Sequence, residues 1–489
     1  MAPRPDTFQA TTTDGAVPMR MGMIDLEFPS PSTSVLTSSP LQQVVVLVDP
    51  MSTGVILQDK VFESGIYSVV IVWSDRSQPA AREKHFKNSG RPREDFLGVI
   101  THEDGALEDT LLAILAATTN MTVAAVMCGS EFGVLLEDQI ADGLNLKLGT
   151  THLRGSGIPI LNTKVDKHLQ ANTIRESGLD AVREKLALCE ADVKAFLDEN
   201  HEPGTSFVVK PQTGAGSVGV TFCDSPKAVW EAYYKILVGE HKAHCRNKYR
   251  HYDQAGVLLQ EYLKGTEYIV NSVVCDGRIK TTAMWKYDKR PYNGAAFVCF
   301  SKELQVISDP NCEEILEYTE KVLKAVGFQS GAIHAEVMYT ARGPVLVELN
   351  CRLHGGNGAW VRPAEICMGY DQLSMLMDVY LNGGKLFDCI PSRPMTANSY
   401  CQQVKMRSHI EGVLASVIPS QWKRIEALPS YYSHLFGVSK GDNLLKTVDM
   451  PSVPGEVTLV HTDKDQLAAD YEKLNEILAE GIFQVEEAS

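Results

Sequence analysis

The pattern of apolar and polar residues first becomes regular at Val44, where VVVLVD forms a continuous apolar run. Such a run is typical of a strand that is buried on both faces of a sheet. The following residues alternate between helical spacing and apolar strands, in the order GVILQDKVFESG, SVVIVW, LEDTLLAILAA, MTVAAVM and EFGVLLEDQIADGL. This alternation predicts a small parallel sheet with helices on its faces. No GxGxxG motif follows the first strand, so a nicotinamide-binding Rossmann domain is disfavoured.

Later segments predict strands that follow one another more often than they alternate with helices. Strands are expected in FVVK, VTFCD, VLLQ, EYIVNSVVCD and RIKTTAMWK, and a hairpin is expected over 331–350. Helical spacing appears at 164–178, 311–326, 371–381 and 464–480. The predicted fold class is therefore α/β, with an α+β character after the N-terminal parallel-sheet domain.

A glycine-rich segment separates two of these strands, because Gly214, Gly216 and Gly219 form a GxGxxG motif. A dinucleotide fingerprint needs a strand, the loop and then a helix, whereas here the next helix begins only at Ser225. We interpret the motif as the tip of a β-hairpin, where backbone N–H groups can approach phosphate oxygens. Lys210 ends the entering strand and would bring its charge near those phosphates. The alternative is a solvated lysine beside a flexible turn.

The hairpin GAIHAEVMYTARGPVLVELNCR, 331–352, carries the most informative polar residues. If its turn, Ala341-Arg342-Gly343, centres on Arg342, Glu336 lies opposite Glu348, and Asn350 shares their face. Facing carboxylates destabilise a strand pair unless a cation lies between them. Carboxylate and amide oxygens together with phosphates suit Mg²⁺. Arg352 continues this face and would reach a transferring phosphoryl group; the alternative is an ordinary hairpin with one glutamate in solvent.

Composition narrows the possible partners of the chain. Its 489 residues are 44% hydrophobic and carry a formal net charge of -15. That charge opposes binding to nucleic acid phosphates, and no apolar run approaches the roughly 20 residues of a membrane span. The 11 cysteines form no CxxC pair, so we expect reduced thiols and a cytoplasmic protein. Small molecules are the expected partners, with a homodimer as an open alternative.

Five segments in fixed order resemble the ATP-grasp superfamily: VDK, FVVKPQTGAGSVGV, QEYLKGTEYIV, Glu336 and ELNCR. The resemblance covers about 42–390, and VVVLVDPMSTG resembles the start of its amino-acid ligase branch, which includes bacterial dipeptide ligases. It implies an N-terminal domain, a first ATP-grasp part with a glycine lid, and a second part with the Mg²⁺ and ATP site. With a disordered leader and a C-terminal α+β subdomain, the expected divisions are 1–40, 41–155, 156–262, 263–390 and 391–489.

The resemblance also implies roles for individual residues. Lys167 and Lys210 would hold ATP phosphates, and Glu267 would bind the ribose. The metal ligands, for a pair of Mg²⁺ ions with Mn²⁺ as an alternative, would be Glu336, Glu348 and Asn350, and Arg352 would stabilise the transferring phosphate. The residues of the phosphate lid would be Gly214, Gly216, Ser217 and Gly219. The residues lining the adenine pocket would be Gln260, Glu261 and Leu263.

Three further residues are candidates for substrate binding. Arg290, His354 and Arg362 would orient substrate carboxylates through charge-assisted hydrogen bonds, although each is equally compatible with an ordinary surface or loop position. The expected reaction joins a carboxylate to an amine through an acyl phosphate, at the expense of ATP. The alternatives are a carboxylase-type or purine-pathway ATP-grasp enzyme and an ATP-binding regulatory protein without catalysis. The sequence does not identify either substrate.

Overall fold

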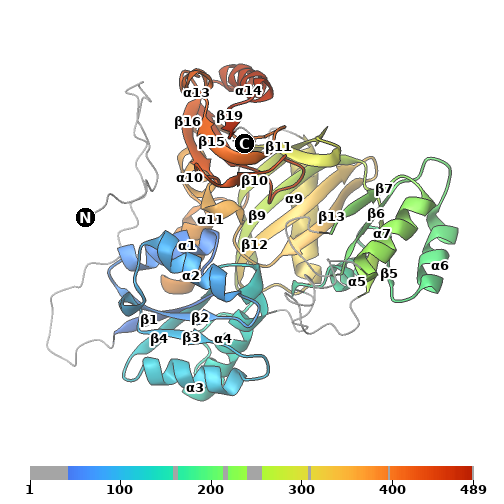
Figure 1. Cartoon of the computed structure of the whole chain (residues 1–489). Coiled ribbons are helices and arrows are strands. Elements are labelled where there is room, and N and C mark those ends of the chain that lie inside the picture. Colours follow the sequence, from blue (N-terminus) through green and yellow to red (C-terminus); the bar gives the residue numbers. More distant parts are fainter. Residues whose placement is uncertain are drawn as a thin grey trace.

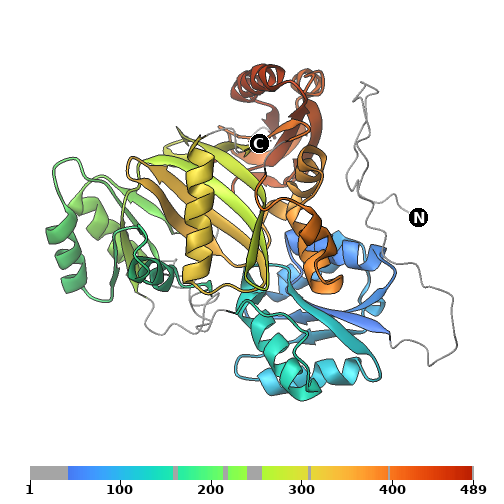
Figure 2. The same cartoon turned by 180° about the vertical axis from the view of Figure 1, so that it is seen from behind.

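The computed structural model describes residues 42–157, 164–212, 219–238, 256–306, 310–394 and 397–486. The expected leader, 1–40, lies outside the described residues. A parallel sheet with helices on both sides, a small antiparallel sheet and a large antiparallel sheet make up the fold (Figure 1, and from behind in Figure 2). Within the described ranges, no helix is long and apolar enough to cross a membrane.

The N-terminal sheet is parallel, with strand order β3-β2-β1-β4, which confirms the alternating pattern. Its apolar runs are buried on both faces because helices cover each side. The strands are β1 (Gln43–Val48), β2 (Tyr67–Trp73), β3 (Gly98–Thr101) and β4 (Thr122–Cys128). The helices are α1 (Thr53–Glu63), α2 (Pro79–Ser89), α3 (Leu107–Ala117) and α4 (Val134–Leu148), with short 3-10 turns η1 (Arg93–Asp95) and η2 (Glu131–Gly133).

A second, smaller sheet carries the glycine-rich segment and has the order β5-β8-β6-β7. β6 and β7 pair antiparallel on either side of that segment, which confirms a strand–loop–strand arrangement. Its strands are β5 (Glu184–Ala187), β6 (Phe207–Pro211), β7 (Thr221–Cys223) and β8 (Val257–Glu261). The neighbouring helices are α5 (Lys167–Glu176), α6 (Glu190–Asn200) and α7 (Pro226–Val238).

The large sheet has eight antiparallel strands in the order β13-β12-β9-β10-β11-β14-β18-β16. One face packs against α9 (Pro310–Ala325) (Figure 2), and the other shares a core with α1, the N-terminal strands and residues 353–377. The strands are β9 (Gly265–Cys275), β10 (Arg278–Tyr292), β11 (Ala295–Gln305), β12 (Gly331–Thr340), β13 (Gly343–Asn350), β14 (Tyr400–Lys405), β16 (Tyr431–Phe436) and β18 (Gly455–His461).

The remaining elements surround this large sheet. α10 (Val361–Met368), α11 (Gln372–Leu381) and α12 (Lys385–Cys389) follow the 3-10 turn η4 (Gly356–Gly358). The C-terminal part adds α13 (Pro419–Glu426), α14 (Lys464–Glu480) and a small sheet of β15 (Gly412–Val417), β17 (Asn443–Leu444) and β19 (Phe483–Val485). Because β14, β16 and β18 extend the large sheet, that sheet runs from residue 265 to residue 461.

Sequence reasoning did not predict β11. Its signal is the dipeptide Asn293-Gly294, which joins β10 to β11 with φ values of 49° and 83°. An Asn-Gly pair between apolar strands is a strong hairpin signal, since both turn residues adopt positive φ. Asn293 also donates hydrogen bonds to the carbonyls of Ser408 and Thr447, at 2.9 and 3.0 Å. These bonds hold the turn against the C-terminal part of the chain.

Candidate active site

The β12–β13 hairpin pairs Glu336 with Glu348, as predicted, but for a different reason. Thr340 pairs with Gly343, so the turn consists of two residues and would by itself place Glu336 opposite Val347. A bulge in β13 adds one residue and shifts the register, so that Glu336 meets Glu348 and His334 meets Asn350. The bulge therefore brings both carboxylates to one face.

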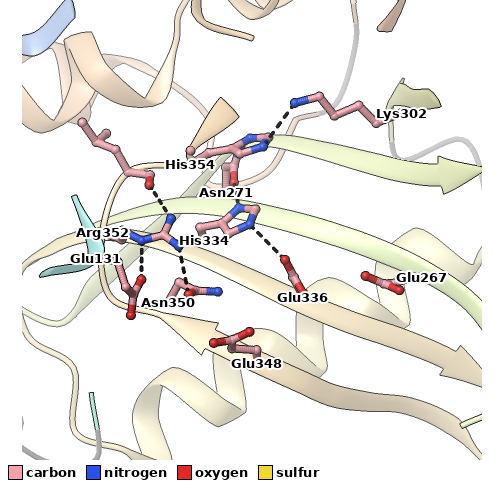
Figure 3. Close-up of polar contacts among 12 residues, drawn as sticks. Glu131, Glu267, Asn271, Lys302, His334, Glu336, Glu348, Asn350, Arg352 and His354 are labelled. Atoms are coloured by element: carbon pink, nitrogen blue, oxygen red, sulfur yellow. Dashed lines mark hydrogen bonds and ion pairs between the residues drawn. The ribbon is translucent and has the colours of Figure 1, made fainter. Parts of the chain in front are cut away.

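Each carboxylate at this edge has a nitrogen partner, and Figure 3 shows the contact between Glu336 and His334. Glu348 lies 2.8 Å from the Lys167 ammonium, and Glu336 lies 3.4 Å from Nε2 of His334. Glu267, on neighbouring β9, accepts two hydrogen bonds of 2.7 Å from Lys289. Burial alone would raise the pKa of Glu336, but His334, Lys289 and Arg352 outweigh it and lower the pKa to about 2.

Two lysines face these carboxylates from the small sheet and its neighbouring helix. Lys167 is the first residue of α5, whose N-cap Asp166 accepts hydrogen bonds from the backbone of His168 and Leu169. Lys210 is buried on β6, and burial together with the nearby charge of Lys167 lowers its pKa to about 8. An anion such as a phosphate would stabilise the charged form of Lys210.

A cavity of about 1310 Å³ unites most of the expected nucleotide-binding residues. Gly219, with φ of 76°, lines it, whereas Gly214, Gly216 and Ser217 lie outside the described residues. The other expected residues on its wall are Lys167, Lys210, Gln260, Glu261, Leu263, Glu267, Glu336 and Glu348. The side chains come from both antiparallel sheets, so the cavity lies where these sheets meet.

The side chain of Glu261 has partners that sequence reasoning did not anticipate. Its carboxylate accepts hydrogen bonds from the backbone and guanidinium of Arg183 and from the guanidinium of Arg342. Arg342 also forms an ion pair of 2.7 Å with Asp180. Arg342 thus joins the turn of the β12–β13 hairpin to β8 of the small sheet. Because these bonds occupy the carboxylate of Glu261, the backbone around Glu261 is the part suited to contacting the edge of an adenine base.

Arg352 lies between the N-terminal sheet and the acidic edge. Its Nε donates a hydrogen bond of 2.5 Å to Glu131 of η2, and its Nη2 donates one of 3.1 Å to Asn350 (Figure 3). Sequence reasoning missed Glu131, which is 221 positions away along the chain. The available signal was its place just after β4, since ligands of parallel α/β sheets gather at the carboxyl ends of the strands.

The three candidate substrate residues lie in different surroundings. Arg290 pairs with Asp288 at 2.6 Å and Arg362 with Glu365 at 2.7 Å, and neither lines the cavity. His354 is buried, stacked between His334 and Trp360, and bonded to Asn271 and Lys302. The structure therefore brings His354 close to the acidic edge and leaves the two arginines outside the cavity.

The donor set at the acidic edge suits a hard cation that also binds phosphate. Among the described residues, no group of three or more His, Cys, Asp or Glu side chains is arranged to hold a metal ion. Two carboxylates and an amide oxygen supply only part of an octahedral shell, and Mg²⁺ commonly completes such a shell with waters and substrate phosphates. Glu336, Glu348 and Asn350 fit that role.

Comparisons with known proteins agree with this geometry. Residues 204–360 match the family described as ATP-grasp domain. Dapdiamide A synthase of Enterobacter agglomerans is 27% identical over 379 residues, which span 77% of this chain and 83% of that protein. Human carnosine synthase 1 is 24% identical over 237 residues, or 47% of this chain and 25% of that protein.

Solved structures show the same fold at low sequence identity. The L-amino acid ligase of Bacillus licheniformis has a TM-score of 0.66 and 13% identity, with 92% of this chain and 100% of that chain covered. The ADP complex of N5-carboxyaminoimidazole ribonucleotide synthetase has a TM-score of 0.59 and 14% identity, covering 90% and 98%. Residues 204–360 of the chain therefore form an ATP-grasp domain. The chain is an ADP-forming ligase of carbon–nitrogen bonds, similar to members of the carboxylate–amine ligase branch.

Proposed function

We propose that this enzyme joins the carboxylate of one amino acid, or a related small acid, to the amine of another through an acyl-phosphate intermediate. The observation that carries the proposal is the cross-strand pair of Glu336 and Glu348 on the cavity that also receives Lys167 and Lys210. That arrangement suits a nucleotide triphosphate with a divalent cation, because phosphoryl transfer depends mainly on positioning and charge neutralisation.

Glu336, Glu348 and Asn350 would hold Mg²⁺, which supplies charge neutralisation for the nucleotide phosphates. The attack of a carboxylate on a γ-phosphate brings two anions together, so the protein must counter their repulsion. Lys167 and Lys210 do so from the side of the small sheet. Arg352 does so from the side of the N-terminal sheet, held in place by Glu131.

The proposed reaction has two steps. A carboxylate oxygen of the first substrate forms a bond to the γ-phosphorus, and the bond from that phosphorus to ADP breaks. The amine nitrogen of the second substrate then attacks the acyl carbon, the bond from that carbon to the phosphate oxygen breaks, and the amine loses a proton. Since acyl phosphates hydrolyse, the enzyme must exclude water from this edge during the reaction.

A screen of amino-acid pairs with ATP and Mg²⁺, with phosphate release and product mass as readouts, tests the proposal. Transfer of ¹⁸O from the labelled carboxylate into the released phosphate is the expected signature of the acyl phosphate. If turnover occurs without that transfer, the proposed intermediate is wrong. Turnover that requires bicarbonate would instead favour a carboxylase-type enzyme, since biotin carboxylases share this fold.

A further inference from the structure

A second group of buried charges lies on the same face of the large sheet, at the opposite end from the acidic edge. Lys302 on β11 pairs directly with Gln403 on β14, and Lys405 pairs with Glu456 on β18. Lys302, Gln403, Lys405 and Glu456 are all buried. Lys405 and Glu456 form an ion pair with each other, so the positive charge of Lys405 is matched within the sheet.

Lys302 has no such match. Among the described residues, no carboxylate oxygen lies within ion-pairing distance of its ammonium. That ammonium contacts Nε2 of His354 at 3.2 Å and lies 5.4 Å from the ring centre of Trp285. Burial and the charge of Lys405 lower the pKa of Lys302 to about 8. A buried cation without a counter-charge costs stability, which is understandable if a ligand supplies the anion.

Two neighbours of Lys302 also have polar atoms without partners. Nε1 of Trp285 and Oε1 of Gln403 are buried, and neither atom has a hydrogen-bond partner in the described part of the chain. Trp285 lies diagonally across the β10–β11 pair from Lys302, since Trp285 pairs with Leu304 and Tyr287 with Lys302. Buried polar groups normally find partners. The ammonium of Lys302 and the indole N–H of Trp285 are thus two buried donors on one face of the sheet.

A chain of short contacts connects this cluster to the acidic edge. From Lys302 it runs to His354, then through Asn271 to His334 at 3.0 Å for each step, and ends on Glu336 at 3.4 Å. Figure 3 shows these side chains in a curved row from Lys302 to Glu336. The cluster and the proposed phosphoryl-transfer edge are thus connected through side chains on one face of the sheet.

The glycine loop Gly355–Gly358 covers the cluster. A Cβ atom placed on Gly356 would lie 3.9 Å from the Lys302 ammonium, and this glycine has φ of 69°. Thr53 of the N-terminal domain donates hydrogen bonds to the carbonyls of His354 and Gly355, at 2.6 and 3.1 Å. The position of the loop, and with it access to Lys302, therefore depends on contact with the N-terminal domain.

We infer that Lys302 binds the carboxylate of the amino acid that provides the amine, with the indole N–H of Trp285 as the second donor. A carboxylate offers an acceptor oxygen to each donor and matches the charge of Lys302. The amine of the same molecule would then point along the row toward the acidic edge. This inference rests on the proposed function and specifies its second substrate as an amino acid with a free carboxylate, rather than a simple amine.

The test separates activation of the first substrate from attack by the second. Hydroxylamine traps an acyl phosphate as a hydroxamate, so ATP, each of the twenty common amino acids and hydroxylamine report activation alone. Ligation is then measured with the same amino acids and with their carboxamides as acceptors. We expect the wild type to prefer free acids over carboxamides by about 10–100-fold in kcat/KM, the usual range for loss of a charged hydrogen bond.

Lys302→Met removes the charge and retains much of the volume. We expect it to raise the KM for the acceptor acid by about 10–100-fold, to abolish the preference over the carboxamide, and to leave hydroxamate formation unchanged. Equal wild-type use of acids and carboxamides would overturn the inference even if the variant fails to fold. So would a variant that slows hydroxamate formation as much as ligation. Absence of hydroxamate from every acid would instead refute the proposed function itself.

Discussion

The buried charged side chains at the two ends of one face of the large sheet differ in how they are paired. At the acidic end, on β9, β12 and β13, Glu267, Glu336 and Glu348 each lie beside a lysine or histidine. At the basic end, on β11, β14 and β18, Lys405 pairs with Glu456, whereas the partners of Lys302 among the described residues are His354 and the ring of Trp285. Among the described residues, each carboxylate of the acidic end has a nitrogen partner, whereas Lys302 at the basic end has no carboxylate partner.

This difference indicates where each ligand contributes most. At the acidic end a divalent cation must compete with Lys167 for Glu348, so binding there depends on the nucleotide arriving with the metal. At the basic end an incoming carboxylate meets a cation that burial has destabilised, and it gains a partner without displacing another. The two ends therefore suit the two halves of a ligation: phosphoryl transfer at one and acceptor positioning at the other.

The largest loss of activity is expected when a proposed metal ligand of the acidic end is replaced. Glu348→Gln keeps the shape of the side chain but removes a metal-binding charge, and we expect the protein to fold and kcat to fall by more than about 10³-fold. ADP formation with the best amino-acid pair measures it. Glu108→Gln is a matched control, since Glu108 is an exposed carboxylate with its own lysine partner. Near-normal turnover in Glu348→Gln would refute the metal assignment.

The next effect concerns stability at the basic end. The pKa of Lys302 is lowered to about 8, so between pH 8 and the usual lysine value the unfolded chain binds more protons than the folded one. The wild type should therefore gain stability as pH rises through this window, by up to about 3 kcal/mol. Lys302→Met has no titrating group at this position. We therefore expect the variant to be more stable than the wild type below pH 8, and the difference in the free energy of unfolding to become smaller toward pH 10.

Thermal unfolding of both proteins at pH 7, 8.5 and 10 measures that difference. Lys405→Met is the informative control, because it leaves Glu456 buried without its cationic partner and should destabilise the enzyme at pH 7. If Lys302→Met destabilised the protein as Lys405→Met does, the Lys302 ammonium would be a structural element and not a ligand-binding one.

A smaller effect is expected from the contact that links the acidic end to the N-terminal domain. Glu131→Gln replaces a charged hydrogen-bond acceptor of the Arg352 guanidinium with a neutral one. Burial lowers the pKa of Arg352, but the charge of Glu131 helps to raise it above its usual value. Arg352 would remain charged but less well oriented, so we expect kcat to fall about 10-fold with little change in KM for ATP. Steady-state kinetics at saturating acceptor distinguish the two constants. A rise in KM for ATP with unchanged kcat would contradict a positioning role.

The acidic end was far more visible in the sequence than the basic end. Glu336, Glu348 and Asn350 lie within one hairpin, so local alternation was enough to place them on one face, although the bulge that sets their register left no local sign. Lys302 lies on β11, which was not predicted, although Asn293-Gly294 is a signal for the turn before it. Glu131 reaches Arg352 through the packing of two domains, which periodicity cannot reveal.

The smallest effect is expected outside both ends. Arg290 and Arg362 are partly exposed, each pairs with an acidic neighbour at the surface, and neither lines the cavity. Exposed ion pairs contribute about 0–1 kcal/mol, so Arg290→Ala and Arg362→Ala should change acceptor KM by less than about 2-fold and leave kcat unchanged. Acceptor titrations of both variants beside Lys302→Met give the sharpest form of the comparison. If either arginine variant raised acceptor KM as much as Lys302→Met, the carboxylate of the acceptor would be bound at the rim of the sheet, and the buried lysine would lose its assigned ligand.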